Sequence, residues 1–248
     1  MRRQAVSNST AAKDRRQILS VAVGFLVLLA AIAFTTRVHA SDVLAEPSRP
    51  DPAIEGQPNE ASGQDLYSRG FYPEALAEWK RAVEINKDAG AAFRLGEEYF
   101  DAKVVERDVE EALKYYFIGA RGGDRRAQMD LASMYDKGWG VAQDMKAAAK
   151  WYEAAARQGL ESSQYNIATM YEDGVGVEAS KVKAYMYYQL AIEGGFPRFA
   201  AEAIERLAGS MTAAEIKEAS VLARNFQPLT PVESVAEVKA WDDETDVN

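Results

Sequence analysis

Hydrophobic positions between residues 60 and 226 recur with a helical period, and the pattern returns after 36 residues. Leu95, Leu131 and Ile167 hold equivalent places, and a tyrosine follows each of them four residues later. Residues four apart share one face of a helix, so this spacing predicts a helix with a buried apolar stripe. An alanine, an aromatic pair and a glycine follow at the same offset: Ala112/Ala148/Ala184, Tyr115–Tyr116/Trp151–Tyr152/Tyr187–Tyr188 and Gly123/Gly159/Gly195. Each unit therefore predicts a pair of helices.

The predicted turn between the two helices contains glycine in two of the units, in the segments DKGWGV (136–141) and EDGVGV (172–177). Gly138 and Gly174 suit the left-handed residue that follows a helix end. The first unit has Ala102 and Val104 where these glycines are expected. The predicted N-caps of the second helices are Asp108, Asp144 and Ser180. Capping boxes are predicted for Asp108 with Glu111 and for Thr212 with Glu215.

This pattern resembles the Sel-one-like repeat, a glycine-loop branch of the tetratricopeptide superfamily. The matching signature, A-x-x-x-[LI]-x-x-x-Y-x-x-G-x-G-V-x-x-[DS]-x-x-x-A-x-x-[WY]-Y-x-x-A-x-x-x-G, is present at 127–159 and, with Ser163 at its first position, at 163–195. The unit at 91–123 departs from it at both loop glycines and has Gly119 at the last alanine position. Residues 65–87 resemble an ordinary tetratricopeptide hairpin. The resemblance implies an all-α fold, a right-handed α-solenoid of stacked helix-turn-helix repeats. It implies little about function, because such repeats are scaffolds with many partners.

The predicted organisation has four parts. Residues 1–40 are an export signal or an N-terminal signal anchor, and residues 41–60 are a proline-rich linker. The repeat domain covers 61–225, with units near 61–90, 91–124, 127–160 and 163–196 and closing helices at 197–225. Residues 226–248 form an acidic tail that we expect to be disordered, with one or two helical turns near 232–241.

The first 40 residues have the three parts of an export signal: a basic start, an apolar run at 18–34, and Val38 and Ala40 at a small-residue cleavage site. As a helix the apolar run spans ~25 Å, just short of the ~30 Å hydrocarbon core. Two interpretations therefore stay open, cleavage after Ala40 and retention as a single-pass inner-membrane anchor. Both predict an extracytoplasmic, periplasmic location for the rest of the chain.

Composition excludes several kinds of chemistry. The chain has no cysteine and a single histidine, His39, which argues against disulfides, thiolate metal sites and histidine-based catalysis. Its net charge of -9 argues against a nucleic-acid partner. The acidic run at 242–246 lacks the spacing of a calcium loop. We therefore expect no cofactor, no metal and no catalytic residues.

A partner-binding groove is the strongest functional candidate. In the resembling families the first helices line the concave side, and outward positions recur here at the 36-residue offset. Large apolar residues at outward positions indicate a groove for a protein or peptide. The predicted groove residues, including the loop tryptophan, are Phe93, Glu97, Phe100, Met129, Ser133, Asp136, Trp139, Tyr165, Thr169 and Glu172. Two alternatives stay open: the apolar members pack between repeats as core, and Trp139 folds back onto the adjacent hairpin.

The sequence thus predicts a non-catalytic protein–protein interaction scaffold of the bacterial cell envelope, acting as a regulatory or assembly factor. The expected partner is an unidentified protein or peptide, and membrane contact is expected only through residues 18–34 if they are retained. The alternatives are a cell-envelope hydrolase, active on β-lactams or cell wall, and a membrane-tethered structural protein. For the hydrolase, acid–base work would fall to carboxylates, lysine or tyrosine, and no carboxylate pair stands out in the sequence.

Overall fold

The computed structural model describes residues 57–245. The predictions about the export signal, the anchor and most of the linker lie outside these residues. Within them the chain is all-helical, with no strand. The helices are α2 (Glu60–Ser68), α3 (Tyr72–Asn86), α4 (Ala89–Asp101), α5 (Val109–Arg121), α6 (Arg125–Lys137), α7 (Met145–Arg157), α8 (Glu161–Asp173), α9 (Lys181–Glu193), α10 (Pro197–Ala208), α11 (Ala213–Arg224) and α12 (Pro231–Thr245). No helix between residues 57 and 245 is long and apolar enough to cross a membrane.

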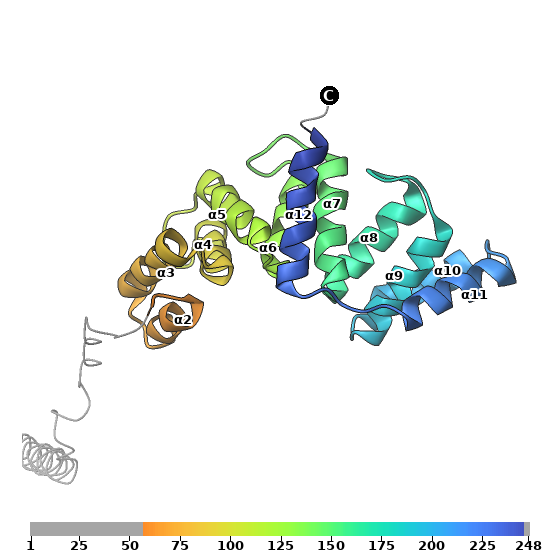
Figure 1. Cartoon of the computed structure of the whole chain (residues 1–248), viewed down its shortest axis with the longest axis horizontal. Helices are drawn as coiled ribbons and strands as arrows, with labels where there is room; N and C mark the ends of the chain where they lie inside the picture. Colours follow the sequence, from red (N-terminus) through yellow and green to blue (C-terminus); the bar gives the residue numbers. More distant parts are fainter. Residues whose placement is uncertain (1–56, 246–248) are drawn as a thin grey trace, which may run out of the picture. The chain divides into compact units, whose positions relative to one another are not determined.

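Consecutive helices pack as hairpins, α4 with α5, α6 with α7 and α8 with α9 (Figure 1). The predicted N-caps are confirmed, because each side chain accepts a backbone N–H from the first turn of its helix. The backbone N–H of each cap residue also donates to a tyrosine carbonyl across the turn, at 2.8–3.0 Å. These bonds are Asp108 to Tyr99, Asp144 to Tyr135 and Ser180 to Tyr171. The fold is the predicted α-solenoid of stacked helix-turn-helix repeats.

The turns close in the same way whether or not they contain glycine. Gly138 and Gly174 are left-handed, with φ of 71° and 67°, as predicted. Ala102 takes the same conformation, with φ of 56°, although a Cβ atom disfavours it. The capping box at Thr212 and Glu215 is confirmed. At Asp108 the side chain caps the helix, while the Glu111 carboxylate pairs with Lys114 instead of completing the box.

The core runs along the inside of the stacked hairpins. The predicted stripe is fully buried at Leu95, Leu131 and Ile167. The alanines at the 36-residue offset (Ala112, Ala148, Ala184) are equally buried, and such small side chains let neighbouring helices approach closely. At the carboxyl end, α10 and α11 both pack against α9. One apolar cluster extends from α4 to α12, and a second cluster joins α3, α4 and α5, as expected of stacked repeats.

The tail differs from the expectation of disorder, because residues 231–245 form α12. This helix packs on α5 and α7 and lies beside α7 in Figure 1. Its Ser234 hydroxyl accepts hydrogen bonds from the side-chain amides of Gln128 and Gln158, at 3.0 and 3.1 Å. Its Trp241 ring meets Trp151 edge-on, with 5.0 Å between the ring centroids. These contacts bury one face of α12 against the repeats, which explains why the acidic tail is helical and not disordered.

Candidate functional site

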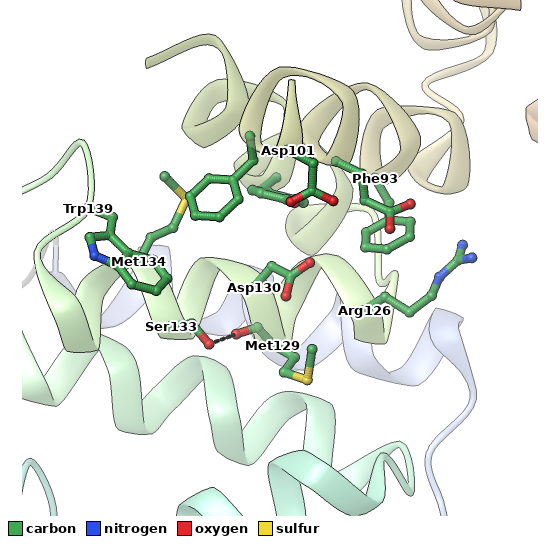
Figure 2. Close-up of a pocket in the computed structure, with 11 residues that line it drawn as sticks. Phe93, Asp101, Arg126, Met129, Asp130, Ser133, Met134 and Trp139 are labelled. Atoms are coloured by element: carbon green, nitrogen blue, oxygen red, sulfur yellow. Dashed lines mark hydrogen bonds between the residues drawn. The ribbon is translucent and has the colours of Figure 1, made fainter. Parts of the chain in front are cut away.

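A pocket of about 350 Å³ lies between α4 and α6, the first helices of two neighbouring repeats. α5 closes one side with an aromatic ring, and the turn after α6 contributes a tryptophan (Figure 2). The lining mixes aromatic, methionine and acidic side chains. It consists of Phe93, Glu97, Phe100, Asp101, Tyr116, Arg126, Met129, Asp130, Ser133, Met134 and Trp139.

The apolar wall is built from rings that contact one another. Phe100 and Trp139 lie with ring centroids 5.5 Å apart, and Phe93 and Tyr116 lie 6.2 Å apart. Trp139 packs on the preceding hairpin yet stays 45% exposed, so it both folds back and faces solvent. A half-exposed indole beside a pocket is the kind of side chain that anchors partner proteins.

Phe93 is placed differently from the prediction. It was expected to point outward, but it is only 6% exposed and belongs to the core. The next repeat covers it, and the guanidinium of Arg126 lies 4.3 Å above its ring. For this residue the alternative interpretation, packing between repeats, is the correct one.

Acidic side chains occupy the middle of the pocket. Figure 2 shows the carboxylates of Asp101 and Asp130 pointing into the space between the two helices. Burial, followed by the repulsion from Glu97, raises the pKa of Asp130 to about 7. Burial, followed by the repulsion from Asp130, also raises the pKa of the Tyr116 hydroxyl. The pocket thus combines an aromatic wall with a carboxylate that is costly to ionise.

The neighbouring charges are already engaged by other residues. Glu97 pairs with Arg94 at 3.1 Å, and Asp101 pairs with Lys103 at 3.1 Å. On the rim, the guanidinium of Arg126 is held at 2.6 Å by Asp124 and at 3.2 Å by Glu60. In contrast, no lysine or arginine between residues 57 and 245 forms an ion pair with Asp130.

A second, smaller pocket of about 250 Å³ lies one repeat further on, between α6 and α8. Of the predicted groove residues, Asp136 and Thr169 line it. Tyr165 lines neither pocket and packs against Tyr188, Phe196 and Phe199. Glu172 also lies outside both pockets, where it accepts a 2.7 Å hydrogen bond from the Tyr188 hydroxyl and pairs with Arg206 at 2.9 Å.

The first pocket therefore brings together six predicted residues: Phe93, Glu97, Phe100, Met129, Ser133 and Trp139. Sequence reasoning missed five others: Asp101, Tyr116, Arg126, Asp130 and Met134. Asp101 and Asp130 directly follow the predicted residues Phe100 and Met129, so widening the outward face by one position would have found both. No group of three acidic or histidine side chains within the described residues is arranged to hold a metal ion.

The fold is an α-solenoid of helical hairpins, and the pocket lies between two neighbouring repeats. Proteins of this architecture are commonly interaction proteins. The family model for the Sel1 repeat matches residues 89–124, 125–160 and 161–196. The chain therefore contains three Sel1 repeats, and such repeats are generally protein–protein interaction modules.

Two solved structures are similar to the chain. A Sel1 repeat protein from Oxalobacter formigenes is 29% identical with a TM-score of 0.55, over 59% of this chain and 59% of that chain. A protective antigen present in uropathogenic Escherichia coli strains, which displays an SLR fold, is 26% identical with a TM-score of 0.57, over 71% of this chain. The match covers only 38% of the length of that antigen. Among curated proteins none matches the chain in sequence.

Proposed function

We propose that this protein is a non-catalytic interaction module that binds an extended segment of a partner protein along α4, α6 and α8. The observation that carries the proposal is the pocket between α4 and α6, where Trp139 and Phe100 form an aromatic wall open to solvent. Binding energy at protein interfaces concentrates in such aromatic anchors beside pockets. The Sel1 repeats at residues 89–196 support the same class of function.

The arrangement of the two pockets favours an extended ligand. They lie on opposite sides of α6, since both contain α6 side chains while α4 lines one and α8 the other. A helix with its side chains is ~10–12 Å across, a distance that three or four residues of extended chain span. A short stretch of partner chain therefore reaches both pockets.

We also propose that the module acts outside the cytoplasm, in a bacterial cell envelope, as a regulatory or assembly factor. The support is the sequence of residues 1–40, with its basic start, its apolar run and its small-residue site at Ala40. Cell fractionation tests the location. The mass of the mature protein separates cleavage after Ala40 from a retained anchor.

A photo-crosslinking amino acid placed at Trp139 in the native cell tests the binding surface. We expect a discrete adduct with one partner from position 139. The matched control is the same substitution at Phe117, an aromatic residue of similar exposure (39%) on α5 that lines neither described pocket. Equal adducts from both positions, or none from 139 in folded protein, would refute the surface. Turnover of β-lactam or cell-wall substrates by the purified protein would instead favour the hydrolase.

A further inference from the structure

Of the three carboxylates that line the pocket, Glu97 and Asp101 form ion pairs within the described chain, whereas Asp130 does not. It lies in the middle of the lining, on the side of α6 that faces α4 (Figure 2). The Tyr116 hydroxyl lies beside it, and no basic residue of the described chain pairs with it. Asp130 is half-buried, and partial desolvation that is not offset by an opposite charge makes its ionised form unfavourable.

The charges around Asp130 add to this deficit. Glu97 and Asp101 line the same pocket, and both raise the pKa of the Asp130 carboxyl. The rim guanidinium of Arg126 cannot relieve it without leaving its partners Glu60 and Asp124. The interior of the pocket therefore favours a positive charge supplied from outside.

The walls indicate what kind of cation fits. The acidic side chains are not grouped closely enough to hold a metal ion, so an organic cation matches the pocket better. Phe100, Trp139 and Met129 line the same pocket as Asp130 and offer an apolar, polarisable surface. Such a surface suits the alkyl stem of lysine or arginine, and the ring faces attract its charged end.

We propose that the partner segment carries a lysine or arginine whose alkyl stem lies against Phe100 and Trp139 and whose charged group pairs with Asp130. The proposal rests on the proposed function, because it names the side chain that the peptide-binding surface selects. It assigns to Asp130 the role of setting specificity, and to the aromatic wall the role of binding any apolar stem.

Fluorescence anisotropy with defined peptides tests this assignment on the full-length protein. The probes are labelled heptapeptide pools with blocked ends, mixed flanking residues and a fixed central residue: lysine, arginine, norleucine or glutamate. Norleucine keeps the alkyl stem of lysine and removes its charge. We expect the lysine and arginine pools to bind at least about tenfold more tightly than the norleucine pool, as for a charge-assisted pair.

Two variants separate the pair from general electrostatics. D130N is close in shape to the native residue, and we expect it to abolish the preference for lysine over norleucine while norleucine binding persists. D65N removes the same charge from an exposed position on α2 and is expected to keep the preference. Circular dichroism checks that both variants are folded.

Each other result has a definite meaning. If norleucine and lysine pools bind equally well and W139S weakens both, the peptide surface stands and the cation assignment is wrong. If lysine binding is unchanged in D130N, another acidic patch holds the charge and the assignment is wrong. If free putrescine binds the pocket as tightly as the lysine pool, the occupant is a small amine and not a peptide. If no pool binds, the assignment fails, and the crosslinking at Trp139 decides separately whether the proposed function fails with it.

Discussion

The turn after α4 holds a residue in a conformation that its side chain opposes, which makes a quantitative test possible. Ala102 has φ of 56°, where a Cβ atom costs about 1–2 kcal/mol. Replacing it by glycine removes this cost but gives the unfolded chain more freedom, which offsets about 0.4–1 kcal/mol. We therefore expect A102G to raise the free energy of unfolding by about 0.5–1 kcal/mol.

Two glycines at related turn positions provide the reverse change. At Gly138, with φ of 71°, an added Cβ atom would meet nothing closer than 3.5 Å. G138A should therefore lose only the conformational term, about 1–2 kcal/mol before the offset from the unfolded chain. At Gly176, with φ of 73°, the added Cβ atom would lie 2.0 Å from the carbonyl oxygen of Met145. G176A should cost more, since the backbone must also move, at about 1–3 kcal/mol extra.

Urea unfolding followed by circular dichroism measures all three variants on one scale. The expected order of stability is A102G above the native chain, then G138A, then G176A. The reasoning would be refuted if A102G were neutral or destabilising, or if G138A and G176A lost equal amounts. The slope of the free energy against urea must stay constant, because a changed slope would indicate loss of two-state unfolding in a repeat protein.

Three further changes test other contacts. The pKa of Asp130 is raised to about 7, so the native state holds this proton more tightly than the unfolded state does. The free energy of unfolding should therefore fall as the pH rises from about 4 to about 7. D130N should flatten this slope and exceed the native melting temperature at pH 8; parallel profiles would contradict it. S234A leaves two buried amide donors without their shared acceptor and should cost about 1–3 kcal/mol in urea unfolding, whereas no loss would show that these hydrogen bonds do not stabilise the docking of α12. T212A removes the cap of α11 and should cost about 1 kcal/mol by thermal melting, with an unchanged melting temperature as the contrary result.

The sequence predicts the helices well because burial repeats with the structure. Leu95, Leu131 and Ile167 are buried for the same local reason, so their 36-residue offset identifies both the unit and its inner face. Capping residues are equally local, since each acts within one turn of chain. The burial of Phe93 is different, because it depends on Arg126 of the next repeat and not on the helix that carries it.

The tail shows where composition misleads. Its acidic residues favour disorder, yet Ser234, Val238 and Trp241 lie three or four residues apart and face the repeats. Whether such a face is used depends on Gln128 and Gln158, more than 70 residues away in the chain. No local pattern contains that information, so the docking of α12 could not be predicted from the tail alone.

The departures from the repeat pattern gather at the junction between the units at 91–124 and 127–160. Ala102 replaces a turn glycine there, Asp130 stands where the next unit has Asn166, and Trp139 stands where it has Val175. The pocket at this junction is the larger of the two, and it contains the half-buried Asp130, whose pKa is raised. Packing alone would favour the same residues at both junctions, since the core is otherwise repeated. Residues that break a local rule at one place, with a measurable cost in stability, are typical of positions that serve binding. If the proposed function holds, we expect the specificity of the module to reside at this junction and the second pocket only to extend the surface.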